Sequence, residues 1–104
     1  MQLSELLSPD CTKCAVEGAS KKRLLEAISQ IAAPKLVGIT RHDIFESLLN
    51  RERLGSTGIG LGIAIPHGRL ANATQPVAVL LTLEKPIEFD AIDNQPVDII
   101  FALL

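Results

Sequence analysis

Aromatic residues are scarce in this chain of 104 residues, which has three phenylalanines, no tryptophan and no tyrosine. A long basic run is also missing, since Lys and Arg total 10 against 12 Asp and Glu and the two signs are mixed along the chain. Nucleic-acid binding needs a basic surface that neutralises several phosphates, and single strands also need aromatic rings on which bases stack. We therefore expect no nucleic-acid partner.

Long apolar runs are absent as well. The longest, Ile99–Leu104, is far shorter than the roughly 20 residues that span a bilayer. The N-terminus, Met1–Leu7, lacks the basic segment followed by an apolar one that marks a secretory signal. We therefore expect a cytoplasmic protein without membrane insertion. Because 47% of the residues are hydrophobic, a chain of this length can bury a core as one domain.

Cysteine is limited to Cys11 and Cys14, which form a Cys-x-x-Cys pair. A redox pair of this spacing normally opens a helix directly after a strand, whereas here the chain runs on into Ala15–Gly18. A zinc site would need two more ligands, for which only His42 and His67 are candidates. We interpret the cysteines as small hydrophobic residues of a strand and expect no metal and no cofactor, with a redox protein as the alternative.

Helices are predicted early in the chain. Ser20 can cap a helix that runs to about Ala33 and is stopped by Pro34. Thr40–Asp43 has the form of a capping box and opens a second helix through Arg51. Apolar residues recur every three or four positions, which predicts one buried face on each helix: Leu24, Leu25, Ile28, Ile31 and Ala32, then Ile44, Phe45, Leu48 and Leu49.

Strands are predicted mainly in the second half. Two continuous apolar runs, Val77–Leu83 and Val97–Leu104, suit central strands that are covered on both faces. The remaining expected elements are short strands at Cys11–Val16 and Ile63–Ile65, a short helix or packing arm at Leu3–Leu7, a loop from Gly55 onward, and turns at Glu84–Pro86 and Asp93–Pro96. Early helices and late buried strands predict an α/β fold with a mixed central sheet flanked by helices, as a three-layer sandwich in the intact domain.

The chain ends at Ala102–Leu104, inside a strand that is predicted to be buried and without a turn, cap or polar tail. A strand in this position lacks whatever would cover it. We therefore expect residues 1–104 to form a single domain that is truncated at its C-terminus. An uncovered apolar strand would also favour a homo-oligomer.

The most informative stretch is Gly55–Leu70, which places His67 between Pro66 and Gly68 after a glycine-rich loop. A neutral imidazole keeps a free lone pair near pH 7, so it can accept a phosphoryl group, provided that a carbonyl of the Pro66–Arg69 turn fixes its other nitrogen. An ordinary loop histidine is the alternative. The hydroxyls and backbone N–H groups expected to bind the phosphate are those of Ser56, Thr57, Gly58, Gly60, Gly62 and Gly68.

A phosphate on His67 would need a guanidinium to neutralise it, and two arginines compete for this role. Arg69 lies two residues after His67 and can equally point to solvent. Arg51 ends the second predicted helix, and the following loop can bring it back over His67. The glycine spacing matches neither a dinucleotide-binding fingerprint nor a Walker A loop, so a nucleotide is not indicated.

Together these motifs resemble the enzyme IIA domains of the phosphoenolpyruvate-dependent phosphotransferase system, of the mannitol/fructose type, and among them most closely the nitrogen-regulatory kind. The resemblance rests on Arg51–Gly60, Gly62–Gly68 and Phe89–Asp98, and Ser20–Arg23 also fits. The chain departs from the family at Leu61, where an Asn or another polar residue is usual. The family also continues past the equivalent of Leu104 into a segment with a second histidine, for which His42 is no substitute.

The resemblance implies a role for the whole domain. His67 would accept the phosphoryl group from the histidine phosphocarrier protein, and Arg51 would contact the phosphate. The output of the nitrogen branch is regulatory, through binding of target proteins that depends on the phosphorylation state. Two alternatives remain: a sugar-specific enzyme IIA that passes phosphate to a IIB domain, and a non-catalytic regulatory binding module.

Two further groups of charged residues have simpler interpretations. Asp90, Asp93 and Asp98 lack the alternating oxygen ligands and the glycine of a calcium loop, so we interpret them as turn-forming residues. Lys21–Arg23 is interpreted as a solvated first turn, although it crowds the unfavourable end of the helix dipole.

Overall fold

The computed structural model describes residues 7–18, 20–71, 73 and 75–104. Apart from Leu7, the element expected at Leu3–Leu7 lies outside these residues. The described elements are η1 (Pro9–Cys11), β1 (Thr12–Val16), α2 (Lys21–Ala32), η2 (Ala33–Lys35), α3 (Arg41–Leu54), β2 (Gly58–Gly60), β3 (Ile63–Ala64), β4 (Ala78–Ile87) and β5 (Val97–Leu103).

Both long helices begin at the residues that the sequence indicates. The Ser20 side chain accepts a hydrogen bond from the backbone N–H of Arg23 at 3.2 Å and caps α2. Thr40 and Asp43 form a complete capping box at the start of α3. Helix α3 continues three residues beyond the predicted end at Arg51, to Leu54, and this extension places Glu52 on its buried side.

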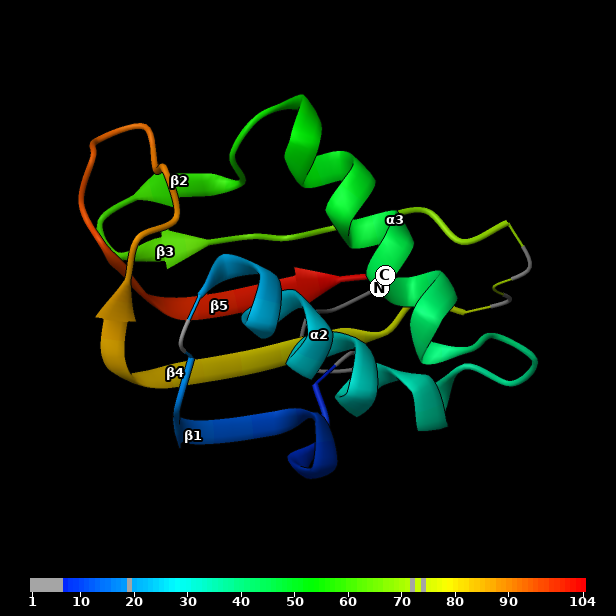
Figure 1. The fold of residues 1–104 in the computed structure, drawn as a ribbon. Helices are drawn as coiled ribbons and strands as arrows, with labels where there is room; N and C mark the ends of the chain where they lie inside the picture. Colours follow the sequence, from blue (N-terminus) through cyan, green and yellow to red (C-terminus); the bar gives the residue numbers. More distant parts are fainter. Residues whose placement is uncertain (1–6, 19, 72, 74) are drawn as a thin grey trace.

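The sheet has five strands in the order β1-β4-β5-β3-β2 (Figure 1). Strand β1 runs parallel to β4, and β4 runs antiparallel to β5. Strand β3 runs parallel to β5 and antiparallel to β2, which forms the edge of the sheet. The mixed sheet and the α/β class predicted from the sequence are therefore confirmed.

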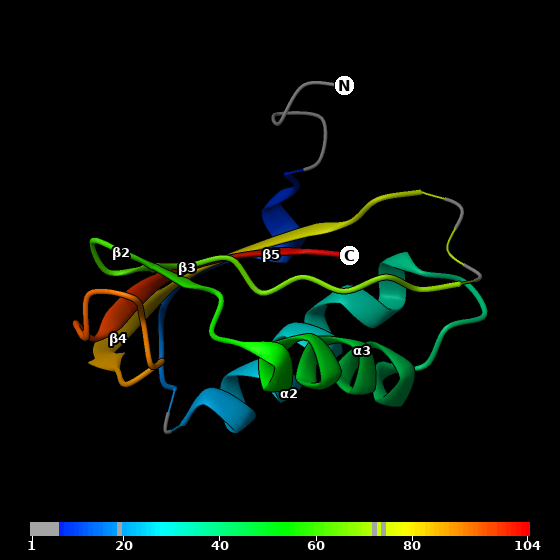
Figure 2. The same cartoon turned by 90° about the horizontal axis from the view of Figure 1, so that it is seen from above.

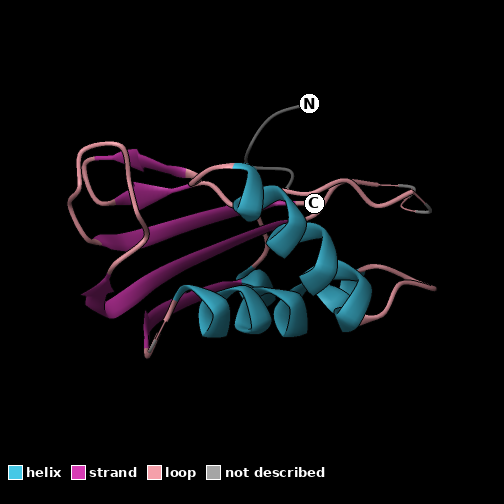
Figure 3. Cartoon of the chain, turned by 45° about the horizontal axis from the view of Figure 1, so that its top comes forward, coloured by secondary structure: helices cyan, strands magenta, loops and turns pink. Residues whose placement is uncertain are grey.

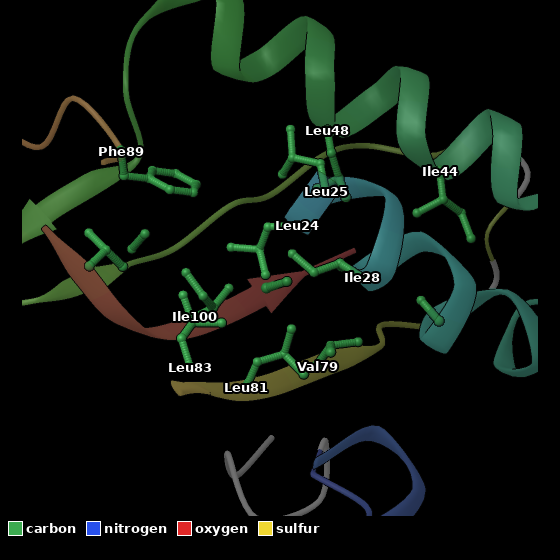
Figure 4. Packing of buried hydrophobic residues seen from close by; sticks show 14 of the residues in the cluster. Leu24, Leu25, Ile28, Ile44, Leu48, Val79, Leu81, Leu83, Phe89 and Ile100 are labelled. Carbon is green, nitrogen blue, oxygen red and sulfur yellow. The ribbon is translucent and has the colours of Figure 1, made fainter. Parts of the chain in front are cut away.

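Both long helices lie on the same face of the sheet (Figures 2 and 3). The core fills the space between them and the sheet, with Leu24 and Ile28 of α2 above Leu81 of β4 and Ile100 of β5 (Figure 4). On the opposite face, Leu80 and Phe101 are half-buried. We expected β4 and β5 to be covered on both faces. Within the described residues the helices cover one face only, and alternate residues of these strands face away from them.

Two segments predicted as loop or turn belong to strands. Gly58–Gly60 forms β2 by pairing with β3, although its glycines indicated a loop. Glu84–Pro86 lies inside β4, where the register against β5 shifts between Thr82 and Ile87. Pro86 sits at this irregularity, the kind of place in a sheet where a residue without an N–H is tolerated.

Each cysteine fits only part of the interpretation, because Cys11 is buried but lies outside a strand, and Cys14 lies in a strand but is exposed. Cys11 is buried at the end of η1 and packs in the core. Cys14 is exposed in β1, so it is not a buried hydrophobic residue. Among the described residues, no helix is long and apolar enough to cross a membrane.

Candidate functional site

His67 lies on an exposed turn whose backbone is fixed on two sides. Strand β3 continues as an extended chain between α3 and the end of β5 (Figures 1 and 2). Leu103 donates its N–H to the carbonyl of Pro66 at 2.9 Å and accepts the N–H of Gly68 at 3.1 Å. On the other side, the Ser47 hydroxyl of α3 donates to the carbonyl of Arg69 at 3.0 Å. The backbone around His67 is therefore held, while its imidazole is open to solvent.

The two ring nitrogens of His67 have different partners. Nδ1 lies 3.0 Å from the carbonyl oxygen of Ile65, and Nε2 lies 3.1 Å from Nε of Arg51. A carbonyl can only accept and a guanidinium can only donate, so these partners assign the proton to Nδ1 and the lone pair to Nε2. The expected backbone anchor is present, but it comes from Ile65 and not from the Pro66–Arg69 turn. The arrangement leaves Nε2 as the nucleophilic nitrogen.

Arg51 is the arginine that the fold brings to His67. Its Nε donates to His67 and its Nη1 donates to the carbonyl of Gly55 at 2.9 Å. The guanidinium is thus held between the imidazole and the loop that follows α3. Arg69 is exposed, and within the described part of the chain the hydrogen bond to the His67 ring comes from Arg51 and not from the Arg69 side chain. Of the two competing arginines, the geometry favours Arg51.

Two glycines allow this close arrangement. Gly55 ends α3 with φ 157° and ψ 151°, a conformation that is essentially restricted to glycine. Gly68 packs against Ser47 so closely that an added Cβ would lie 3.2 Å from the backbone carbonyl carbon of Ser47 and would overlap its hydroxyl. Both positions therefore exclude a side chain for local steric reasons.

The loop residues expected to bind phosphate have partners within the chain. Ser56 donates its hydroxyl to the carbonyl of Phe89 at 2.6 Å, and the N–H of Gly58 donates to the same hydroxyl at 3.0 Å. Thr57 gives both its hydroxyl and its N–H to Glu52. Gly68 uses its N–H on Leu103. Phosphate binding by these groups stays a prediction, and no contact in the structure supports it.

Gly60 and Gly62 lie away from His67. Gly58 pairs with Ala64, so the β2–β3 hairpin turns at Leu61 and Gly62 while the chain leaves β3 in the opposite direction toward His67. At the turn, Leu61 donates its N–H to Asp93 at 3.0 Å. The structure thus separates the glycine-rich stretch into a part beside His67 and a distant turn.

Glu52 is the residue near the site that the sequence analysis did not single out. Its side chain is 4% exposed although it carries a carboxylate. A signal was present in the sequence: Ile44, Leu48 and Glu52 are spaced four residues apart and therefore form one buried stripe on α3. A carboxylate at the end of an apolar stripe indicates a buried partner.

The remaining candidates lie elsewhere. His42 is exposed in the first turn of α3, whereas Arg51 lies in its last turn. Asp93 accepts hydrogen bonds from the N–H groups of Leu61 and Gln95, which hold the pKa of its carboxyl below the ordinary value. Among the described residues, no three His, Cys, Asp or Glu side chains come together in a way that could hold a metal ion.

Comparison with known sequences gives a consistent family. A sequence model of the family described as "Phosphoenolpyruvate-dependent sugar phosphotransferase system, EIIA 2" matches residues 5–104. The nitrogen regulatory protein of Klebsiella oxytoca is 56% identical over 105 residues, which cover 100% of this chain. The chain spans 64% of the length of that relative.

Solved structures show the same fold. The crystal structure of the nitrogen regulatory protein IIA-Ntr from Neisseria meningitidis matches with a TM-score of 0.94 and 40% identity, covering 98% of this chain and 69% of that one. The crystal structure of IIA mannitol from Escherichia coli matches with a TM-score of 0.79 and 16% identity, covering 93% of this chain and 70% of that one. At such low identity the second likeness concerns the fold alone.

Proposed function

The chain belongs to the EIIA 2 family of the phosphoenolpyruvate-dependent sugar phosphotransferase system, and on this premise we propose that it carries a phosphoryl group on His67. The observation that carries the proposal is the pair of contacts on the imidazole. Nδ1 is held by the Ile65 carbonyl, and Nε2 faces the Arg51 guanidinium at 3.1 Å. This combination provides a nucleophilic nitrogen with a cation beside it.

The transfer step follows from this tautomer. The lone pair of Nε2 attacks the phosphorus of a phosphohistidine on the donor protein, and a new N–P bond forms as the donor's N–P bond breaks. The electron pair of the broken bond stays on the donor's ring nitrogen. His67 keeps its proton on Nδ1, where the Ile65 carbonyl stabilises the positive charge that the ring gains. Arg51 then meets the phosphoryl oxygens in place of the bare nitrogen.

We take the donor to be the histidine phosphocarrier protein and the output to be regulatory. The support is the similarity to proteins named nitrogen regulatory protein, at 56% and 46% identity for Klebsiella oxytoca and Pseudomonas aeruginosa. In this reading, phosphorylation adds negative charge to an exposed surface at His67 and so changes which proteins bind there.

The test is phosphorylation in a reconstituted relay. The chain is incubated with labelled phosphoenolpyruvate, the first enzyme of the relay and the histidine phosphocarrier protein. We expect an acid-labile, base-stable label on the wild-type chain and none on His67→Ala. His42→Ala is the matched control and should be labelled like the wild type, because its imidazole is exposed at the other end of α3. Labelling that persists in His67→Ala would overturn the assignment.

The output is tested separately. Passage of the label from the chain to a sugar-specific IIB domain would identify a sugar-transport component in place of a regulatory one. A target protein that binds the wild-type chain and His67→Ala equally, but not the phosphorylated chain, would support the regulatory output.

A further inference from the structure

A buried charged cluster lies beside the proposed phosphorylation site. It consists of Lys21 at the start of α2, Glu52 in the last turn of α3 and Thr57 in the loop before β2, and we call it the Glu52 cluster. The carboxylate of Glu52 accepts from Lys21 Nζ at 2.9 Å, from the Thr57 hydroxyl at 2.6 Å and from the Thr57 N–H at 3.1 Å. Lys21 also lies over the ring of Phe89, 4.7 Å from its centroid.

Burying charged groups costs free energy of folding unless each charge is paired. The Glu52 side chain is 4% exposed and that of Lys21 is 24% exposed, so both have lost most of their water. A carboxylate in this position is tolerated only with a counter-charge and with hydrogen bonds on its oxygens. Here the three donors come from two different elements, α2 and the loop. The cluster therefore fixes the loop against both helices.

The loop in turn holds both groups of the proposed reaction. The Thr57 carbonyl accepts the N–H of Ile65 at 3.0 Å, and the Ile65 carbonyl lies 3.0 Å from Nδ1 of His67. Two residues before Thr57, the carbonyl of Gly55 accepts from Arg51 Nη1 at 2.9 Å. One short segment, Gly55–Thr57, thus sets the position of the imidazole on one side and of the guanidinium on the other.

The pairing of charges around Glu52 also supports a role of the cluster at the site. Glu52 directly follows Arg51 in the sequence, and its carboxylate lies on the buried side of α3. Lys21 pairs with this carboxylate, although its ammonium also lies 3.5 Å from a carboxylate oxygen of Asp90, and Thr57 occupies the Glu52 oxygens. The positive charge of Arg51 stays available for the phosphoryl group.

We infer that Glu52, Lys21 and Thr57 are positioning residues for phosphoryl transfer, which they promote by holding Arg51 and His67 at their contact distance without touching the phosphoryl group. This inference rests on the proposed function of His67. Its distinctive consequence is that loss of the Thr57 hydroxyl lowers the rate of transfer at saturating donor and leaves recognition of the donor unchanged.

The experiment compares Thr57→Val, which removes the hydroxyl and keeps the shape, with Thr57→Ser, which keeps the hydroxyl. Glu52→Gln removes the charge at the same size. Asp10→Asn is the control, because it breaks an ion pair with Lys35 that lies beyond β1, at the other edge of the sheet. All are measured in the full chain, with the phosphorylated histidine phosphocarrier protein as donor and with the folded fraction checked by circular dichroism.

We expect Thr57→Val and Glu52→Gln to lower the maximal transfer rate by about 10- to 100-fold, since a small misplacement of reacting groups has effects of this size. The KM for the donor should stay within about twofold of the wild type. Thr57→Ser should recover most of the rate, and Asp10→Asn should match the wild type.

A second readout does not depend on transfer. Nitrogen-15 spectra of His67 report which ring nitrogen carries the proton. The wild-type chain should show the proton on Nδ1, whereas Thr57→Val and Glu52→Gln should show a mixture of both tautomers because the Ile65 carbonyl is no longer held in place.

The outcomes separate the two proposals. A folded Thr57→Val that is labelled at the wild-type rate, or whose KM alone changes, would overturn the positioning role while the function of His67 stands. A wild-type chain that takes up no label would overturn the function of His67, and the positioning role with it. Unchanged His67 tautomers in both variants would show that the cluster does not orient the imidazole.

Discussion

The glycine-rich stretch Gly55–Leu70 folds into two regions that are held by different kinds of contact. The inner end, Gly55–Thr57 with Ile65–Gly68, is tied to α3 and β5 by buried or half-buried groups, among them Glu52. The tip, Gly60–Gly62, is held by the exposed carboxylate of Asp93 and by the N–H groups of Asp98 and Ile99, which donate to the Gly62 carbonyl at 3.0 Å, and its Leu61 is 91% exposed. A single sequence motif therefore contains two structural regions with separate supports.

This difference assigns different tasks to the two regions. Precise placement of reacting groups needs supporting contacts that solvent does not compete with, and the buried bonds from Thr57 to Glu52 at the inner end are of this kind. The tip carries one exposed apolar side chain, that of Leu61, whose positive φ strains the backbone, and both features affect stability. We therefore expect substitutions at the inner end to change phosphoryl transfer and substitutions at the tip to change stability alone.

Gly68→Ala should have the largest effect. The added methyl group would overlap the Ser47 hydroxyl and approach its backbone, so either α3 or the His67 turn must move. We expect the free energy of unfolding to fall by about 1–3 kcal/mol, as for other overpacked sites, together with a large loss of transfer. Urea unfolding and the labelling rate measure the two effects.

Gly62→Ala is the matched change at the tip. Gly62 has φ +79°, and its added Cβ would lie 3.0 Å from a carboxylate oxygen of Asp98. We expect a loss of about 1–2 kcal/mol from the left-handed backbone, with transfer retained in the folded protein. If Gly62→Ala reduced transfer as much as Gly68→Ala, the separation into two regions would be wrong.

Arg51→Lys should have the next largest effect. A lysine ammonium is a point charge and cannot hold the fixed geometry in which Nε faces His67 and Nη1 faces Gly55. We expect the transfer rate to fall by about tenfold or more with little change in the unfolding midpoint. Arg53→Lys is the control, because Arg53 is exposed and its side chain donates, among the described residues, only to Asn50, at 3.4 Å. Equal rates for both variants would remove Arg51 from the site.

An element of the fold could be predicted from the sequence when the interactions that form it are local. The caps at Ser20 and Thr40 act within three residues, and the apolar runs of β4 and β5 need no knowledge of their neighbours, so these elements were predicted. Strand β2 was missed because glycine has low strand propensity and the segment becomes a strand only by pairing with β3.

The candidate site shows the same difference between residues predicted from local motifs and contacts that depend on distant residues. His67 and Arg51 were recognised through their motif, and the structure brings them together. The roles expected of Ser56 and Thr57 rested on their proximity in sequence to His67. In the structure their hydroxyls bond Phe89 and Glu52, and Phe89 lies 33 residues from Ser56 in the sequence. The long-range partner Phe89 follows from the packing of the loop after β4 against the loop after α3, which no local pattern encodes.

Leu61→Asn tests the tip with a smaller effect of the opposite sign. Leu61 has φ +59°, which strains a leucine and suits asparagine better. Since the side chain is 91% exposed, the change removes little buried surface. We expect stabilisation by about 0.5–1 kcal/mol with unchanged transfer. Ile92→Asn is the control, because Ile92 is similarly exposed, at 83%, and is not among the residues with positive φ. A stabilised Ile92→Asn would mean that lost surface hydrophobicity, and not backbone strain, explains the gain.

The pH dependence of the tip should be the smallest effect. The N–H groups of Leu61 and Gln95 donate to Asp93 and lower its pKa from the ordinary value of 3.8. A carboxyl with a lowered pKa in the folded state stabilises the fold above its ordinary pKa, and this contribution is lost as the pH falls through the folded value. The difference in unfolding free energy between the wild type and Asp93→Asn should therefore be constant near neutral pH and shrink below 3.8. The protection of the Leu61 amide against exchange should fall over the same range relative to the N–H of Asn94, which donates to the Ala91 carbonyl at 2.9 Å and provides an internal reference. Because the tip lies apart from His67, the transfer rate of Asp93→Asn at neutral pH should equal that of the wild type, and a slower rate would show that the two regions are coupled.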